Sequence, residues 1–333
     1  MKSASSVCGN RRLAMPSIKE LSKREDLLSG GHRACAGCGA TIVARQVMLA
    51  AGKNTVVGCA TGCLEVVTTI FPYTAWKVPY IHNAFENVAS TISGVEAAYR
   101  SLKRQGKIKK DMNFIAFGGD GGTYDIGLQA LSGAAERGHK MLYVCYDNEA
   151  YMNTGIQRSG ATPFGAATST CPAGDVIPGK QQYHKDMTRI MIAHRIPYVA
   201  QASPSHWNDL VKKVEKALSK DGPSFINILS PCHRGWRYPM EQTIDMAKLA
   251  VDTCFWPLFE HDEGRWKITY KPKEKLPISA WMAKQGRFSH LSEDSKMMQL
   301  AQEEVDRRWN ELKALAKISD LCEEGKHCEL KDL

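Results

Sequence analysis

Cysteines in two closely spaced pairs are the first sign of chemistry in this chain of 333 residues. Cys35 and Cys38 form a CxxC pair, and Cys59 and Cys63 follow at CxxxC spacing among glycines. Two thiolates at CxxC spacing can hold one metal ion or one iron–sulfur cluster. The pair also fits a redox-active dithiol, but Cys35 does not follow the strand that a thioredoxin-like protein places before it. From spacing alone, zinc and an iron–sulfur cluster both stay open.

A second pattern is Gly119-Asp120-Gly121, with Asn148 further along the chain. Glycines let backbone N–H groups approach a diphosphate, and the helix that we predict to begin near Asp125 would point its positive end at that anion. Mg²⁺ prefers oxygen ligands such as carboxylates and amides. Asp120 and Asn148 follow two predicted strands with one helix between them, so they can converge on one ion. Walker A and GxGxxG motifs do not occur, so nucleotide sites of those kinds have no support.

Strands that alternate with helices must position these residues. After a short strand that begins at residue 55, apolar runs predict strands at 113–117, 141–146, 198–202 and 224–229. Apolar residues at helical spacing predict helices over 86–104, 125–137 and 207–218. This alternation predicts an α/β fold with a mostly parallel sheet and helices on both faces. Ligands of such sheets bind beyond the carboxyl ends of the strands, which places Asp120 and Asn148 at one edge.

The sequence divides into three parts. Residues 1–30 form a polar N-terminal arm, residues 31–235 carry the α/β pattern and both chemical motifs, and residues 236–333 form a C-terminal extension. Within the extension, short strand-like pieces at 255–281 precede a strongly charged helical stretch at 292–321. We expect the extension to pack on partner subunits, because its pattern differs from that of a second catalytic domain.

The order of the motifs resembles the beta subunits of pyruvate:ferredoxin oxidoreductases, which belong to the 2-oxoacid:ferredoxin oxidoreductase family. The resemblance covers residues 30–260 and rests on CAGC, TGCLEV, FENVASTISGVEAA, GGDGGTYDIGLQALSGAAERGH, YDNEAYMNTGIQRSG and the later Pro-Cys pair. It implies a thiamine-diphosphate-binding fold in which residues 31–235 form the domain that binds the diphosphate and the metal. It also implies a [4Fe–4S] cluster beside the coenzyme.

The resemblance gives roles to individual residues. The cluster would be held by Cys35, Cys38, Cys63 and Cys232. Mg²⁺ would be bound by the side chains of Asp120 and Asn148 and by the carbonyl of Ala150. Thiamine diphosphate would contact Gly119, Asp120, Gly121, Gly122, Thr123, Asn148 and Asn153. Asn153 and Thr154 would line the reacting carbon, although Asn153 could equally cap its loop. The family motif commonly has two asparagines where this chain has Asp147-Asn148.

The remaining cysteines are interpreted differently. Cys59 is a rival to Cys63 for the third cluster position, and we favour Cys63 because TGC is the matching motif. Cys145 lies in an apolar strand and Cys171 in a loop, and both are interpreted as structural. The chain has 11 cysteines, an odd number, in a sequence that is not a small secreted scaffold. A disulfide framework is therefore not expected.

The activity that the resemblance implies is oxidative decarboxylation of pyruvate with coenzyme A to acetyl-CoA and CO₂. Electrons would pass to ferredoxin, and the reaction would be reversible, as suits anaerobic metabolism. Neither the glutamate that activates thiamine nor a ferredoxin-type cysteine run is expected on this chain. Alpha-, gamma- and delta-type partner subunits are therefore expected, and the chain alone should be inactive.

Three alternatives stay open. A sister enzyme would perform the same chemistry on branched-chain 2-oxoacids, 2-oxoglutarate or oxalate. A zinc-stabilised binding subunit would have no redox chemistry. An ordinary thiamine-dependent decarboxylase or synthase would not need the ordered set of four cysteines, which argues against that class.

The composition limits the kinds of partner and location. The net charge of +9 is spread along the chain, which fits either a solvated basic surface or a docking face for an acidic partner such as ferredoxin. No interleaved basic and aromatic motif indicates nucleic-acid binding. No apolar run is long enough to span a bilayer, and the first 30 residues lack the apolar core of a signal peptide. We therefore expect a soluble cytoplasmic protein.

Overall fold

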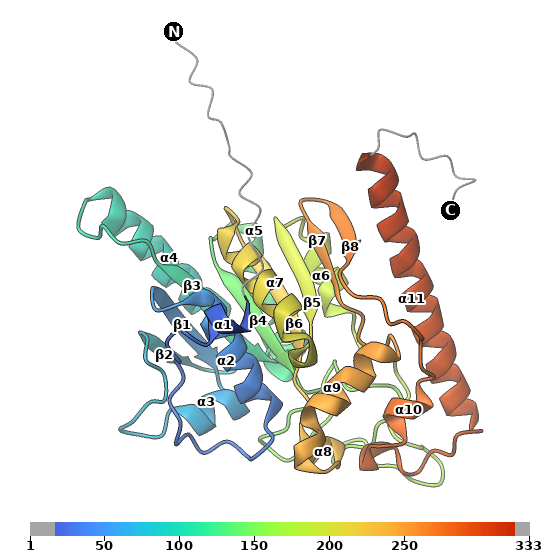
Figure 1. The fold of residues 1–333 in the computed structure, drawn as a ribbon. Coiled ribbons are helices and arrows are strands. Elements are labelled where there is room, and N and C mark those ends of the chain that lie inside the picture. The colour runs from blue at the N-terminus through green and yellow to red at the C-terminus, as the bar shows by residue number, and fades with distance from the viewer. Residues whose placement is uncertain (1–16, 324–333) are drawn as a thin grey trace.

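The computed structural model describes residues 17–323, which contain one eight-stranded sheet (Figure 1). Its strands are β1 (Thr55–Ala60), β2 (Tyr80–Asn83), β3 (Asn113–Gly119), β4 (Leu142–Asp147), β5 (Tyr198–Ala202), β6 (Ser224–Leu229), β7 (Phe259–Asp262) and β8 (Arg265–Ile268). Their order across the sheet is β2-β1-β3-β4-β6-β5-β7-β8. Strands β1 to β6 pair in parallel, whereas β7 and β8 are antiparallel to their neighbours. The predicted α/β class with a mostly parallel sheet is confirmed.

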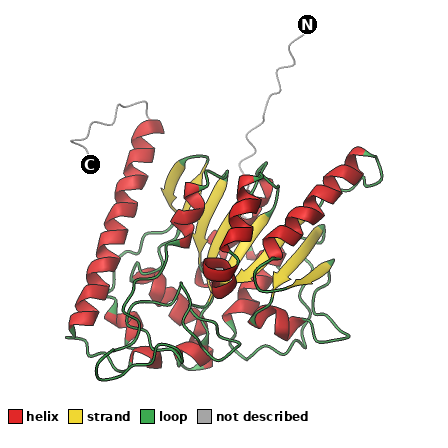
Figure 2. Ribbon diagram, turned by 180° about the vertical axis from the view of Figure 1, so that it is seen from behind, coloured by secondary structure: helices red, strands yellow, loops and turns green. Residues whose placement is uncertain are grey.

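Helices cover both faces of the parallel strands (Figures 1 and 2). On one face, α2 (Gly39–Ala51) and α7 (Trp207–Ser219) share a core with the strands. On the other face, α4 (Val88–Arg104), α5 (Leu128–Glu136) and α6 (Met187–Ala193) do so. The central strands β4 and β6 are buried along their whole length, as expected for parallel strands covered on both sides.

Two of the shorter helices follow the carboxyl ends of strands. They are α3 (Cys63–Thr68), which follows β1, and α8 (His233–Trp236), which follows β6 and leads into α9 (Thr243–Asp252). Two others, α1 (Ile18–Leu21) and α10 (Ser279–Met282), belong to the flanking segments. Because β1, β3, β4 and β6 are parallel and adjacent, the segments that leave their carboxyl ends meet at one edge of the sheet.

The described part of the C-terminal extension packs on its own chain. Strand β7 pairs with β5, and the long helix α11 (Lys296–Glu323) lies beside β8 (Figure 1). Met298, Val305 and Trp309 of α11 share a third core with Trp236 and Trp281. The boundary at residue 235 and any contact with partner subunits stay predictions. Most of the predicted N-terminal arm, residues 1–16, lies outside the described residues. Every helix between residues 17 and 323 is too short or too polar to cross a lipid bilayer.

Candidate active site

The chain enters a helical turn directly after β3. Asp120 already has helical backbone angles, φ −60° and ψ −43°, and residues Gly121–Ile126 form a π-helix, η1, that leads into α5. The prediction of a helix start near Asp125 was therefore wrong by four residues. Glycines are poor helix formers, so the sequence pattern did not indicate that the glycines after Asp120 already belong to the first helical turn. The N–H groups of this turn have no partner within the helix and are free to bind an anion.

Close packing explains why the two residues after Asp120 are glycines. A Cβ atom on Gly121 would lie 2.3 Å from the ring of Tyr151, and one on Gly122 would lie 2.9 Å from the carbonyl oxygen of Phe85. The Tyr151 ring is fixed in turn, because its hydroxyl donates to Asp125 Oδ2 at 3.1 Å. Any side chain at these two positions would push the backbone away from the site, so the glycines keep the loop accessible to a ligand.

Three oxygen-bearing groups converge beside this turn. The Asn148 backbone N–H donates to Asp120 Oδ1 at 3.3 Å. In one orientation of its amide, the Asn148 nitrogen donates to Asp120 Oδ1 at 2.9 Å and to the Ala150 carbonyl at 2.7 Å. In the other orientation the amide oxygen of Asn148 faces the Asp120 carboxylate and the Ala150 carbonyl oxygen. Three oxygens then face one another, and a cation between them would offset their repulsion. The carboxylate, amide and carbonyl match the oxygen donors that Mg²⁺ prefers.

Carboxylates are concentrated beneath the same loop. Burial raises the pKa of Asp120 well above its usual value, and the nearby charge of Asp147 raises it further. Burial also raises the pKa of Asp147 to about 6 and that of Glu149 to about 7. Arg287 forms an ion pair with Glu149. Three buried carboxylates next to each other favour the binding of a further cation.

A small pocket brings most of the predicted coenzyme contacts together. The predicted residues that line it are Gly119, Asp120, Gly121, Gly122, Asn148, Ala150, Asn153 and Thr154. Thr123 is placed differently, because its hydroxyl donates to the Gly119 carbonyl at 2.7 Å and lies 3.1 Å from the Tyr143 hydroxyl. Thr123 is fully buried and does not line the pocket. Sequence reasoning missed further lining residues, among them Gly62, Phe85 and Tyr146.

The four cysteines that the motifs singled out line a neighbouring cavity of about 330 Å³. They are Cys35, Cys38, Cys63 and Cys232, which come from the CxxC loop, the start of α3 and the start of α8. Burial raises the pKa of the Cys63 thiol to about 12, and the charges of Cys232 and Cys38 contribute. Thiols gathered around one cavity give up their protons when a metal ion or cluster binds among them.

The rival cysteines lie elsewhere. Cys59 is fully buried in β1, and Cys145 is fully buried in β4. Cys171 lies in a loop, where its backbone pairs with Thr168, and it does not line the cavity. Between residues 17 and 323, no three side chains of the His, Cys, Asp and Glu types are grouped so that they could hold a single metal ion.

The coenzyme pocket and the cysteine cavity adjoin. Cys63, Asn148, Met152 and Asn153 line both. Cys63 can occupy this shared position because it begins α3, immediately after the turn at the end of β1. Whatever binds among the cysteines would therefore lie next to whatever binds at Asp120 and Asn148.

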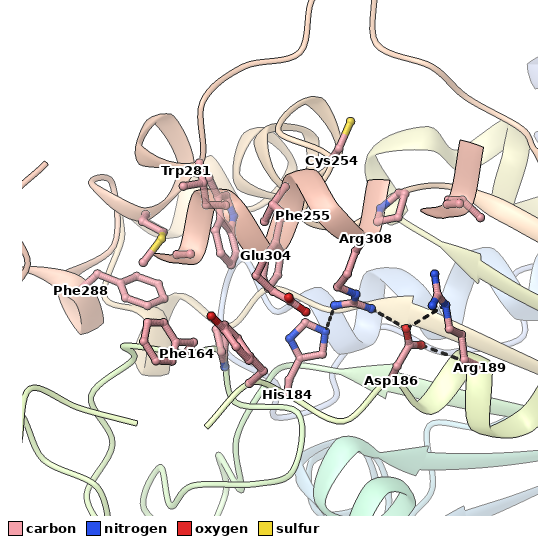
Figure 3. Close-up of a pocket in the computed structure, with 18 of the residues that line it drawn as sticks. Phe164, His184, Asp186, Arg189, Cys254, Phe255, Trp281, Phe288, Glu304 and Arg308 are labelled. Carbon is pink, nitrogen blue, oxygen red and sulfur yellow. Dashed lines mark hydrogen bonds and ion pairs between the residues drawn. The ribbon is translucent and has the colours of Figure 1, made fainter. Parts of the chain in front are cut away.

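A different pocket, beneath α11, contains none of these residues (Figure 3). His184, Asp186, Arg189 and Arg308 meet at its polar end, and aromatic side chains such as Phe255 line the rest (Figure 3). Its walls include side chains of α11 that belong to the third core, so the pocket lies within the packing of α11.

The polar end of that pocket predicts a response to acid. Arg308 donates to His184 Nε2, which must be unprotonated to accept. Burial and the charges of Arg308 and Lys180 hold the pKa of His184 well below its usual value. Below about pH 6.5 the unfolded chain therefore gains a proton that the folded chain does not, and the free energy of unfolding falls by up to about 1.4 kcal/mol per pH unit.

We expect His184→Gln to flatten this decline when urea midpoints are compared between pH 7.5 and 5. The matched control is His290→Gln, which removes an exposed histidine and should leave the wild-type slope. Equal slopes for wild type and His184→Gln would contradict the prediction.

Comparison with known proteins places the chain in a class. Residues 57–228 match the family described as thiamine pyrophosphate enzyme, C-terminal TPP binding domain. In structure, the chain is similar to a 2-oxoglutarate:ferredoxin oxidoreductase from Magnetococcus marinus, with a TM-score of 0.52 and 20% sequence identity. That likeness covers 68% of this chain and 82% of the other and shows the fold. The fold and the site thus define a thiamine-diphosphate-binding chain.

Curated relatives narrow the class further. The chain is 53% identical to the pyruvate synthase subunit PorB of Thermotoga maritima, covering 90% of this chain and 95% of the relative. It is 57% identical to the PorB subunit of Methanocaldococcus jannaschii, covering 81% and 92%. The ketoisovalerate oxidoreductase subunit VorB of Pyrococcus abyssi is 42% identical, covering 92% and 97%. The chain belongs to the pyruvate synthase PorB family of thiamine-diphosphate-dependent oxidoreductases, which act as subunits of a complex.

Proposed function

We propose that this chain is the thiamine-diphosphate and [4Fe–4S] subunit of a pyruvate:ferredoxin oxidoreductase. The complex would convert pyruvate and coenzyme A reversibly into acetyl-CoA and CO₂, with ferredoxin as electron acceptor. The observation that carries the proposal is the shared wall between the two pockets, in which Cys63 and Asn148 belong to both. Bound thiamine diphosphate supplies a ring that stabilises the carbanion left by decarboxylation, and a cluster accepts electrons singly.

The diphosphate end of the coenzyme would bind at η1. Asp120, Asn148 and the Ala150 carbonyl would hold Mg²⁺, and the free N–H groups of the first helical turn would face the diphosphate. Asn153 and Thr154 are exposed in the loop that borders both pockets. Asn153 is therefore available to donate to a substrate carbonyl or to the coenzyme.

The cysteine cavity favours a cluster over a single ion. A structural zinc ion draws four thiolates to one point, whereas these four thiols surround a space of about 330 Å³. Four cysteines around one cavity are the ligand set of a [4Fe–4S] cluster.

The substrate and partners follow from the relatives. Those named for pyruvate synthase are more similar to this chain, at 53% and 57% identity, than the one named for ketoisovalerate, at 42%. Pyruvate is therefore the favoured substrate, and branched-chain 2-oxoacids are the alternative. Phe71 and Tyr73, which follow α3, are 94% and 78% exposed, as expected of a surface that another subunit covers. Ferredoxin would be the external partner.

The decisive test is the cofactor content of the anaerobically purified native complex. We expect one thiamine diphosphate with Mg²⁺, and about four iron and four sulfide per chain beyond those of the partner subunits. Cys63→Ser should lose this iron, because it removes one of the four ligands.

The matched control is Cys59→Ser, four residues away, which changes a cysteine outside the cavity and should keep the iron. Stoichiometric zinc without iron or thiamine diphosphate would refute the proposal and favour a zinc-stabilised binding subunit. Turnover with ketoisovalerate or 2-oxoglutarate in preference to pyruvate would support the proposed reaction type and refute pyruvate as the substrate.

A further inference from the structure

Tyr146 has a buried hydroxyl without a partner at the border of the two pockets. It is the penultimate residue of β4, and the side chain is 1% exposed. Its hydroxyl makes no hydrogen bond within the described residues. An unsatisfied buried hydroxyl destabilises the folded chain, and such a group calls for a specific explanation. An acceptor that reaches the hydroxyl only when the site is occupied is the explanation that its position suggests, because Tyr146 lines the pocket that Cys63 also lines.

Both functional loops make room for this side chain. A Cβ atom on Gly62, the residue before Cys63, would lie 2.6 Å from the Tyr146 hydroxyl. A Cβ atom on Gly119, the residue before Asp120, would lie 3.3 Å from the same hydroxyl and ring. The hydroxyl therefore sits between the loop that carries Cys63 and the loop that carries Asp120.

The possible acceptors around the hydroxyl differ in how far they are already satisfied. Asp120 accepts from the Ser159 hydroxyl at 2.5 Å and from the Asn148 backbone N–H. Cys59 is a buried thiol that donates to the Ala60 carbonyl at 3.6 Å, and it does not line the pocket. Cys63 lines the same pocket as Tyr146 and directly follows Gly62, whose Cβ position would touch the hydroxyl.

We propose that the Tyr146 hydroxyl donates a hydrogen bond to the sulfur of Cys63 when that cysteine ligates the cluster, which makes Tyr146 a residue that sets the cluster's reduction potential. This inference rests on the proposed function. Hydrogen bonds to cluster sulfurs favour the reduced form, which carries one more negative charge. A hydrogen bond to a charged group is worth enough to change the reduction equilibrium about tenfold, or about 59 mV for one electron.

The test is Tyr146→Phe in the assembled complex, with a redox titration of the cluster followed by electron paramagnetic resonance. We expect the iron content to match the parent complex, while the reduction potential of the cluster becomes more negative by about 59 mV, the equivalent of a tenfold change in the reduction equilibrium. Tyr143→Phe is the matched control, because it removes a buried hydroxyl from the same strand that contacts Thr123 instead. Its cluster potential should equal that of the parent.

The outcomes separate the two proposals. A cluster signal in the parent with an unchanged potential in Tyr146→Phe would overturn this inference alone. So would a loss of thiamine diphosphate affinity at constant potential, which would assign the hydroxyl to the diphosphate. A parent complex without this cluster signal would overturn the proposed function and, with it, the inference.

Discussion

The complex with Asp120→Asn is expected to lose its thiamine diphosphate on gel filtration and with it almost all turnover. Asparagine keeps an oxygen at this position but removes the charge that faces Asn148 and Ala150. Loss of outer partners of a metal site already costs about 10–100-fold in affinity, so loss of a direct carboxylate ligand should cost at least about 100-fold. Bound thiamine diphosphate and Mg²⁺ per chain, together with turnover at saturating coenzyme, are the measurements.

A control separates this effect from a general loss of buried charge. Asp252→Asn removes a buried carboxylate of α9 that lies outside both pockets and bonds Lys248 and Tyr270. It should retain the coenzyme. The iron content of Asp120→Asn should also stay at the parent level, because the cysteine cavity does not include Asp120. Retention of thiamine diphosphate and turnover within about twofold of the parent would contradict the assignment of Asp120 to the metal.

The central strands could be predicted because their burial is visible in the sequence. β4 is an apolar run that ends at Asp147, and β6 is apolar except for Ser224 and Asn227, as suits strands covered on both faces. The edge strand β2 has the sequence YIHN, too short and too polar for a periodicity to show, and it forms by pairing with β1. Helices α6 and α9 were also missed, because they are short and lie in segments whose overall pattern is irregular.

At the candidate site, too, some residues could be predicted from the sequence and others depend on the folded arrangement. The motifs indicated Asp120, Asn148 and the CxxC pair, since these residues are close in sequence or follow predicted strands. That Cys232 meets Cys63 depends on the parallel order of β1 and β6 within the sheet, which spacing alone does not give. The role of Tyr146 was invisible for another reason, because an aromatic residue in an apolar strand looks like core until its hydroxyl is found without a partner.

Arg287 is the residue that sequence reasoning had least chance of finding. It comes from the C-terminal extension, is 2% exposed and pairs with Glu149, which lies between Asn148 and Ala150. Its guanidinium lies 4.2 Å from the ring centre of Trp236. Trp236 in turn donates to the Asn148 carbonyl at 2.8 Å. Two side chains from later in the chain thus hold the loop of proposed metal ligands.

The contacts of Arg287 and Trp236 are expected to matter because the loop of residues 148–150 is strained. Glu149 has a φ of +68°, which side-chain-bearing residues rarely adopt. Arg287→Met would leave the Glu149 carboxylate buried without its ion-pair partner, at a cost of about 3–5 kcal/mol in the free energy of unfolding. The double variant Arg287→Met with Glu149→Gln removes both charges and should recover part of that loss, so the two effects should not add.

Unfolding in urea measures these costs, and retention of thiamine diphosphate reports whether the ligand loop keeps its shape. Arg307→Met is the matched control, because Arg307 pairs with Glu304 and Glu311 on the exposed side of α11. Surface pairs of this kind contribute at most about 1 kcal/mol. If Arg287→Met costs no more than Arg307→Met, or if the single effects simply add, the buried pair does not hold the loop. A larger cost at Arg287, with partial recovery in the double variant, would mean that the C-terminal extension supports the coenzyme site from within the same chain.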